Sequence, residues 1–236
     1  LLGIPIMTAE YLIGRRSAKS PVGAYRTLGG RHSLWVLVGF MGILTGFIIL
    51  SYYTAIAGWT LAYILRSVLQ TYFSKDATVV FQELISSPIE PIIYLIIFMF
   101  FTAIIVFYGI QKGIERWCKI LMPALFIILI ILIIRSITLP GSFEGLKFYI
   151  KPEFAKLTPK AILAALGQAF FSLSLGMGIM ITYGSYLDKK TNLLTSSVWV
   201  STMDTLVALL AGFVIFPAVF AFGLQPTAGP GLTFIT

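Results

Sequence analysis

Long uninterrupted blocks of apolar residues are the feature that most limits what this chain can fold into. A membrane-spanning helix needs about 20 consecutive, mostly apolar residues, and residues 117–137 are one of several blocks of that kind. Hydrophobic residues fill 58% of the 236 positions before the 21 glycines are counted, and charged residues fill only 11%. A water-soluble globule cannot bury that much apolar surface. The sequence therefore predicts an all-α polytopic membrane protein.

The apolar blocks define the predicted spans when each is matched to a hydrocarbon core about 30 Å thick. We expect a partial helix over residues 1–13 and complete helices over about 34–65, 92–108, 117–137, 161–187 and 193–224. Residues 71–91 and 140–160 are more polar and are predicted as connecting loops. Because the chain begins within a helix and ends in a Pro/Gly-rich stretch from Gln225, we interpret residues 1–236 as a single transmembrane domain fragment of a longer protein.

The basic residues predict the orientation of these spans. Ten of the 17 Lys and Arg residues flank three short connections, and an excess of positive charge marks the cytoplasmic side. These ten residues are Arg15, Arg16, Lys19, Arg26, Arg31, Lys112, Arg116, Lys119, Lys189 and Lys190. We therefore interpret the net charge of +8 as a signal of membrane orientation and not of nucleic-acid binding. The expected location is the cell (inner) membrane, crossed several times.

Single cysteine and histidine residues exclude several classes of function. Cys118 is the one cysteine, so neither a disulfide framework nor a multi-cysteine metal site can form within the chain. His32 is the one histidine, and neither His-rich metal clusters nor a His-based catalytic triad fits its position at the edge of an apolar block. We therefore do not expect an enzyme.

Asp204 is the one acidic residue deep inside an apolar block. It lies about ten residues from the start of its predicted helix, or roughly 15 Å into the bilayer. A carboxylate at that depth costs a few kcal/mol, so it should face a cation or a water-filled cavity. The alternative is a structural carboxylate that accepts hydrogen bonds from neighbouring hydroxyls such as Thr202 or Thr205.

The segment from Phe170 to Gly178 predicts an interruption in the helix over 161–187. Residues two apart do not share a helix face, so Ser172 and Ser174 can address one site only if the helix is broken. Gly176 and Gly178 would make such a break cheap, and unwound backbone at this depth is tolerated only where it lines a cavity. The following half-helix would attract a carboxylate with its N-terminus. The alternative is a continuous helix whose small residues pack against a neighbour.

Two further patterns each allow a functional and a structural interpretation. Gly42, Gly46, Ile49 and Tyr53 share one face of the helix over 34–65, which favours either close helix packing or one wall of a pocket. Gly113 and Pro123 are weak points near the start of the helix over 117–137, which could unwind there or carry a static kink.

Glu10 is an acidic residue within the partial helix over residues 1–13. We interpret Glu10 as a buried hydrogen-bonding partner or a carboxylate that reaches toward the interface, and not as a ligand of a transported ion.

Several motifs together resemble one known family. They are residues 3–7 with Glu10 and residues 14–15, Tyr52-Tyr53 with residues 58–61, residues 112–116, and residues 170–178. In this order they are similar to the neurotransmitter:sodium symporter family, in particular to its bacterial leucine transporter branch. The resemblance implies a fragment that covers family helices two to seven of an inverted-repeat transporter fold with a broken sixth helix.

The resemblance also implies roles for single residues. Ile49, Tyr53, Phe171, Ser172, Ser174 and Met177 match substrate-binding positions, and Ser172 and Asp204 match ligands of a sodium ion. The remaining matches support the unwound segment, border the ion site or gate the inward path: Glu10, Gly113, Pro123, Gln168 and Gly176.

Two departures from the family pattern refine the expected function. Most members have Asn where this chain has Asp204, and many have Phe where it has Met177. We therefore expect a sodium-coupled symporter of large hydrophobic or aromatic amino acids that works by alternating access in the lipid bilayer and does not need chloride. A proton- or cation-coupled amino-acid permease, a membrane scaffold and a channel are the alternatives. The sequence does not indicate the oligomeric state.

Overall fold

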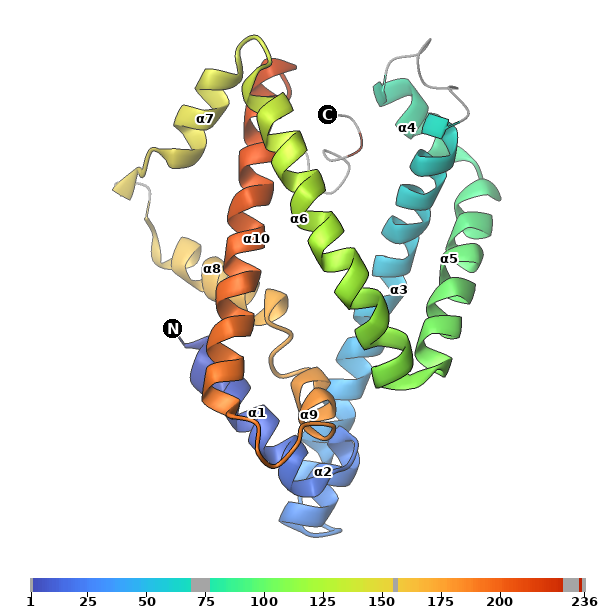
Figure 1. The fold of residues 1–236 in the computed structure, drawn as a ribbon, viewed down its shortest axis with the longest axis vertical. Coiled ribbons are helices and arrows are strands. Elements are labelled where there is room, and N and C mark those ends of the chain that lie inside the picture. Colours follow the sequence, from blue (N-terminus) through green and yellow to red (C-terminus); the bar gives the residue numbers. More distant parts are fainter. Residues whose placement is uncertain (1, 69–76, 155–156, 227–233, 235–236) are drawn as a thin grey trace. The chain divides into compact units, whose positions relative to one another are not determined.

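Every regular element that the structure describes is a helix. The structure is a computed structural model, and it describes residues 2–68, 77–154, 157–226 and 234. The helices are α1 (Gly3–Ser17), α2 (Pro21–Gly29), α3 (Trp35–Val68), α4 (Ala77–Ser86), α5 (Glu90–Phe107), the π-helix η1 (Ile110–Glu115), α6 (Arg116–Ile137), α7 (Ser142–Ile150), α8 (Pro159–Ser172), α9 (Ile179–Gly184) and α10 (Leu193–Ala221). Figure 1 labels the α-helices. Most of the Pro/Gly-rich stretch expected after Gln225 lies outside the described residues.

Four helices are long and apolar enough to cross a membrane. They are α3, α5, the stretch Lys112–Ile137 that includes α6, and α10, with mean hydropathies from 2.0 to 2.8. At about 1.5 Å per residue, the 18 residues of α5 reach roughly 27 Å, close to the thickness of the hydrocarbon core. The predicted all-α polytopic membrane fold is confirmed.

The span predicted over 161–187 is broken in the structure. Its first part is α8, which ends at Ser172, and its second part is the six-residue helix α9 from Ile179 to Gly184. Residues 173–178 between them are not helical, as the ribbon in Figure 1 shows. The broken helix that the family resemblance implies is therefore present, and its second half ends before Leu187.

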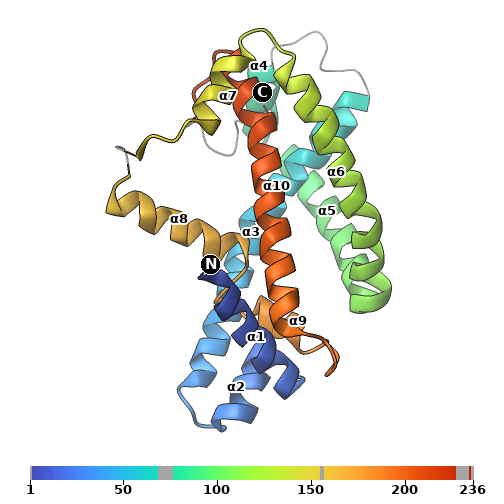
Figure 2. The ribbon, with the colours of Figure 1, turned by 60° about the vertical axis from the view of Figure 1, so that its left-hand side comes forward.

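Three short helices occupy segments for which the sequence predicted loops. They are α2, α4 and α7, and none of them contains an apolar run of membrane-spanning length. Helix α7 packs against the C-terminal half of α10, as Figure 2 shows, and Tyr149 donates a hydrogen bond to the Leu209 carbonyl oxygen at 3.2 Å. A Cβ at Gly145 would overlap the Phe216 carbonyl, so this glycine permits the contact.

The chain forms two compact units. The first contains residues 1–50 and 153–206, and the second contains residues 51–152 and 207–236. In the first unit, the buried core consists of Met7, Tyr11, Leu175, Met180 and Leu193. A Cβ at Gly14 would overlap the Ile181 carbonyl, and one at Gly184 would overlap the backbone of Tyr11. These two glycines let α1 and α9 cross with their backbones in contact.

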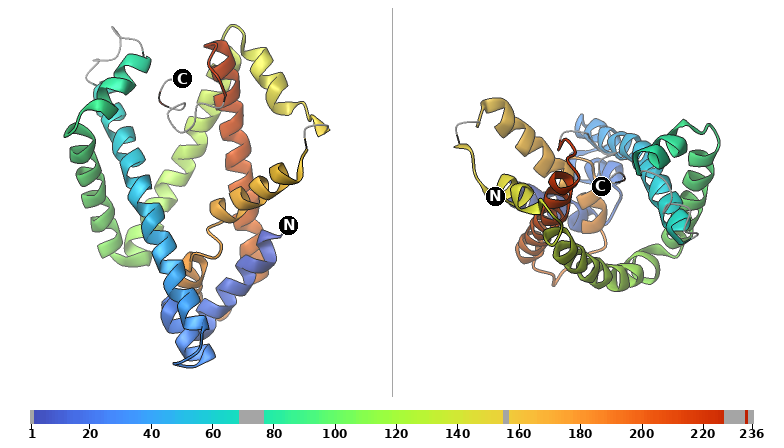
Figure 3. Two further views of the ribbon diagram at one scale, coloured as in Figure 1. Left: turned by 180° about the vertical axis from the view of Figure 1, so that it is seen from behind. Right: turned by 90° about the horizontal axis from the view of Figure 1, so that it is seen from above.

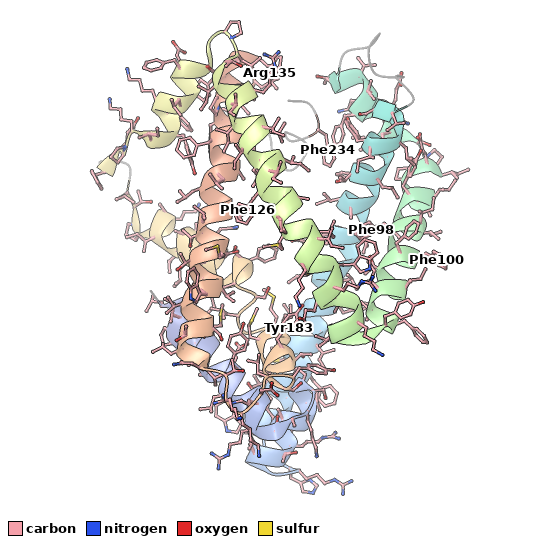
Figure 4. The ribbon with its side chains drawn as sticks, viewed as in Figure 1. Phe98, Phe100, Phe126, Arg135, Tyr183 and Phe234 are labelled. Carbon is pink, nitrogen blue, oxygen red and sulfur yellow. The ribbon has the colours of Figure 1, made fainter. Side chains whose placement is uncertain are left out.

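The second unit pairs the C-terminal half of α3 with α5, and the two run side by side in Figure 3. Gly58 allows this approach, because a Cβ there would lie 2.9 Å from the backbone nitrogen of Leu95. Arg66 and Glu90 form an ion pair between the two helices. Phe234, labelled in Figure 4, stacks on Phe81 of α4 at a ring distance of 5.6 Å.

Candidate functional site

The interruption between α8 and α9 is built from backbone hydrogen bonds that end one helix and from residues with positive φ. The Leu175 N–H donates to the Phe170 carbonyl at 2.9 Å, and the Ser174 N–H donates to the Phe171 carbonyl at 3.1 Å. This pair of bonds is the Schellman motif, in which the residue after the helix cap has a positive φ. Ser174 has a φ of +55°, and only a few per cent of non-glycine residues adopt such a conformation.

Two glycines continue the interruption. Gly176 has a φ of +77° and Gly178 a φ of +73°, values that residues with a Cβ rarely adopt. The two differ in their surroundings, because a Cβ at Gly176 would meet nothing within 4 Å whereas one at Gly178 would lie 2.7 Å from the ring of Pro21. The glycines that the sequence predicted as cheap break points therefore lie where the backbone needs them.

Glu10 of α1 supports the interrupted backbone directly. Its Oε1 accepts a hydrogen bond of 2.7 Å from the Gly176 N–H, which has no helical partner. Glu10 is 8% exposed, and its other oxygen, Oε2, is buried without a hydrogen-bond partner among the described residues. The interpretation of Glu10 as a buried hydrogen-bonding partner agrees with this geometry.

Helix α3 approaches the interruption from another direction. A Cβ at Gly42 would lie 3.1 Å from the backbone carbon of Met177 and 3.2 Å from the nitrogen of Gly178. Gly46, one turn further along α3, has open space around its Cα. Of the two glycines predicted on one face of this helix, Gly42 therefore packs against the interruption and Gly46 borders open space.

Ser172 and Asp204 are the polar pair of this site. The Ser172 hydroxyl, at the end of α8, donates to both carboxylate oxygens of Asp204 on α10, at 2.7 and 2.8 Å. Thr205 instead donates to the Ser201 carbonyl at 2.8 Å. The structural alternative predicted Thr202 or Thr205 as the hydroxyl partner of Asp204. The partner in the structure is instead Ser172, from the interrupted helix. A carboxylate and a hydroxyl at one point offer hard oxygen ligands to a cation.

The other predicted substrate-binding residues divide between the two units. Phe171 is the last but one residue of α8, Met177 belongs to the interruption, and Ile49 lies on α3 within the same unit. Tyr53 lies in the second unit, where its ring centroid is 5.1 Å from that of Tyr52. Gln168 is one helical turn before Ser172 on α8, so both can share a face.

The Gly113 to Pro123 region keeps a helical backbone. Gly113 is buried in the π-helix η1, where a Cβ would overlap the Ile105 carbonyl. The helix α6 continues through Pro123 without interruption. A π-helical turn is an unusual conformation that often occurs at functional sites. Unwinding of this region remains a prediction.

Several contacts around the site were not predicted from the sequence. Thr8 of α1 donates to the Ser197 hydroxyl of α10 at 2.9 Å. Arg15 donates to the Thr191 carbonyl at 2.7 Å, which fastens the end of α1 to the loop before α10. Pairs of Ser and Thr on apolar helices are the signal that could have suggested such cross-helix bonds, but the sequence does not say which helices are neighbours.

Known proteins resemble this chain over almost its entire length. Residues 69–228 match the model of the Sodium:neurotransmitter symporter family. An uncharacterized sodium-dependent transporter of Bacillus subtilis, YhdH, is 43% identical over 99% of this chain and 52% of its own length. The sodium-dependent serotonin transporter of Drosophila melanogaster is 35% identical over 63% of this chain and 25% of its own length.

A solved structure has the same fold. The crystal structure of MhsT in complex with L-phenylalanine matches with a TM-score of 0.92 and 46% sequence identity, over 99% of this chain and 54% of that one. The inverted-repeat transporter fold expected from the resemblance is thereby confirmed for this fragment. Two of the curated relatives match 99% of this chain, and the chain spans only about half of their length.

Proposed function

Because the chain belongs to the Sodium:neurotransmitter symporter family, we propose that the full-length protein is a sodium-coupled symporter of amino acids in the cell (inner) membrane. The single observation that carries this proposal is the Ser172–Asp204 pair beside an interrupted helix. Transport by alternating access needs no covalent chemistry, only a site that binds ion and solute together and opens to each side in turn. The names of relatives such as YhdH support sodium as the coupling ion.

Sodium suits the donor set of this site. It prefers hard oxygen ligands, and a carboxylate within an apolar helix gains stability from a nearby cation. The Ser172 hydroxyl donates its hydrogen bond to Asp204, so the lone pairs on its oxygen remain available to the ion. Unwound backbone at residues 173–178 adds carbonyl groups at the same level, and such carbonyls are typical cation ligands in transporters.

Uptake measurements on the full-length protein test sodium coupling. We expect Asp204→Ala to abolish concentrative uptake of amino acid, because the site loses the carboxylate that would bind the ion, and we expect normal expression. Thr202→Ala, two residues away on the same helix, is the matched control and should transport normally. A proton-coupled permease is the competing function, since Asp204 can carry a proton. Uptake that persists without sodium and follows the pH gradient would favour that alternative.

The substrate-binding residues support large hydrophobic or aromatic amino acids. Phe171 lies at the end of α8 and Met177 within the interruption, and the unbranched methionine adapts to different side-chain shapes. Gly46, with open space around it, lies on the helix that carries Ile49. MhsT, of the same fold, was crystallised with L-phenylalanine. Competition of labelled substrate by a panel of amino acids checks this proposal, and a preference for glycine, alanine or acidic amino acids would contradict it.

Transport should not require chloride. The resemblance implies that chloride-dependent members balance the sodium charge with a bound anion, which hydroxyl groups help to hold. In this chain the position one turn beyond Asp204 is Ala208, which offers an anion no hydrogen bond. The carboxylate of Asp204 would already supply a negative charge, and in low dielectric a second anion would be repelled by several kcal/mol in order of magnitude.

Replacement of chloride by gluconate measures this independence. We expect the uptake of the wild-type protein to be unchanged, and a large loss would contradict the charge argument. The double variant Asp204→Asn with Ala208→Ser removes the fixed charge and adds a hydroxyl. We expect that variant to gain a chloride requirement, whereas Ala208→Ser alone should remain independent of chloride because Asp204 is intact.

A further inference from the structure

A cavity of about 740 Å³ lies beside the segment that follows α5, which includes η1 and the start of α6. It is lined by Tyr108, Lys112, Arg116, Trp117 and Ile120, all of which belong to the second unit. Lys112 and Arg116 are four residues apart, so their side chains can extend on one side of the helix. The cavity therefore holds two cations among aromatic and aliphatic side chains.

The two cations in this cavity have no counter-ion within the described part of the chain. Neither Lys112 nor Arg116 forms an ion pair there, whereas Lys119 on the next turn pairs with Glu115 at 2.6 Å. Two like charges at the edge of an apolar helix repel each other and attract an anion. A lysine and an arginine side by side are a typical pair for binding a phosphate group.

A second, apolar cavity shares a lining residue with the first. It has a volume of about 310 Å³ and is lined by Phe100, Ala103, Ile104, Phe107 and Tyr108, so that Tyr108 belongs to both cavities. Phe100 is labelled on α5 in Figure 4. None of the 18 residues of α5 is buried, and the mean hydropathy of this helix is 2.4. The pair of cavities thus has one basic and one apolar end.

The position of the cavities along the chain matches the membrane boundary. The apolar helix α5 ends at Phe107, and basic residues follow within a few positions. Tyr108 and Trp117 are of the residue types that gather at the level of lipid headgroups. We expect this boundary to be the cytoplasmic one, and the cytoplasmic leaflet carries the anionic lipids that basic pockets between helices recognise.

We propose that the two cavities bind one anionic phospholipid of the cytoplasmic leaflet. Its phosphate lies between Lys112 and Arg116, and an acyl chain occupies the apolar cavity beside Ala103 and Ile104. A phospholipid fits better than free phosphate because an apolar cavity lies on the same residue, Tyr108, that lines the basic one. This inference does not depend on the proposed transport function, since its readout is bound lipid.

Native mass spectrometry of the purified full-length protein tests the proposal. Phosphatidylglycerol should bind more tightly than phosphatidylcholine with the same acyl chains. The double variant Lys112→Gln with Arg116→Gln should lower the affinity for phosphatidylglycerol by about tenfold or more and leave phosphatidylcholine unaffected. Lys119→Gln removes one basic residue of the same helix outside the cavity, and this control should retain wild-type affinity.

A second variant keeps both cations and fills the apolar end. Ala103→Phe places a ring in the apolar cavity at an exposed position, where little destabilisation is expected. It should weaken the binding of long-chain phosphatidylglycerol but not the binding of a short-chain analogue with the same headgroup. This variant decides the matter if the double variant does not fold.

Four results would overturn the proposal. The first is equal binding of the two lipids to the wild-type protein, as expected if the rest of the protein covers the cavities. The second is an equal loss of phosphatidylglycerol affinity in Lys119→Gln, which would indicate general surface charge. The third is inorganic phosphate binding as tightly as phosphatidylglycerol. The fourth is unchanged binding of long-chain phosphatidylglycerol in Ala103→Phe.

Discussion

Helix α6 and residues 170–178 both contain residues that weaken a helix, and only residues 170–178 are interrupted. Helix α6 carries Pro123 in its interior and follows a glycine in η1, yet it continues to Ile137. Residues 170–178 contain no proline, and the helix there ends at Ser172 and resumes at Ile179. The presence of a poor helix former therefore does not predict where a membrane helix breaks.

The difference lies in what receives the freed backbone groups. At the interruption, the Gly176 N–H donates to Glu10, and the Ser174 and Leu175 N–H groups donate to carbonyls of α8. Around Pro123 the neighbouring residues are apolar and exposed, such as Leu121 and Met122. An open backbone among them would leave N–H and C=O groups without partners in hydrocarbon, at a cost of several kcal/mol each. A break is stable where polar partners are already in place.

The largest expected effect comes from Gly178→Ala, which tests whether the interruption depends on a residue without a Cβ. A Cβ there would carry the strain of a φ of +73° and would also overlap the ring of Pro21. We expect a loss of about 2–4 kcal/mol from strain and overpacking together. The midpoint of thermal unfolding of the full-length protein measures the loss.

Gly176→Ala is the matched control for that variant. Its φ is similarly positive, at +77°, but nothing lies within 4 Å of the added Cβ. This variant should lose only the strain, about 1–2 kcal/mol. Equal losses in the two variants would show that the contact with Pro21 does not matter.

The second effect in size comes from Glu10→Ala. Removing this carboxylate leaves the Gly176 N–H without its acceptor, and an unsatisfied buried donor costs about 1–3 kcal/mol. Glu10→Gln retains an oxygen that can accept the same bond, so we expect a smaller loss in thermal stability. If both variants lose equally, the hydrogen bond is not what supports the interruption. Glu144→Ala, on the loop helix α7, controls for general loss of negative charge.

Much of the fold followed from the sequence, because long apolar blocks can form only helices in a bilayer. The spans that became α3 and α5 are examples. The short helices α2, α4 and α7 did not follow, since each is stabilised by contacts with its surroundings, as Tyr149 shows for α7. These segments contain no apolar run of membrane-spanning length, so the pattern that indicates a spanning helix is not found in them.

Prediction of the site was limited in the same way. The residues at the interruption could be named from their glycines and serines, and Asp204 from its depth in an apolar block. The residues alone did not identify the hydroxyl that meets that carboxylate, because hydrogen bonds between helices depend on their neighbours in space; the family resemblance implied Ser172. The sequence also offered Gly113 and Pro123 as a second weak point, and there the backbone in the structure stays helical.

The smallest expected effect comes from Ser174→Gly, which compares the end of α8 with the end of α10. Both ends form the same pair of hydrogen bonds, since the Leu224 N–H donates to Val219 and the Gly223 N–H donates to Phe220. Helix α10 places glycine at the position of positive φ, with a φ of +66°, and α8 places Ser174 there at +55°. A serine in this conformation costs roughly 1 kcal/mol more than a glycine.

Ser174→Gly should therefore raise the thermal unfolding midpoint slightly, and Gly223→Ala should lower it by a similar amount. Because Ser174 is a proposed substrate-binding residue, we expect the same variant to bind the amino acid more weakly, which equilibrium binding of labelled substrate would detect. A rise in stability with a fall in affinity indicates that the hydroxyl is kept for binding at the expense of strain. A fall in both would mean that the hydroxyl stabilises the interruption itself, and the comparison between the two helix ends would then fail.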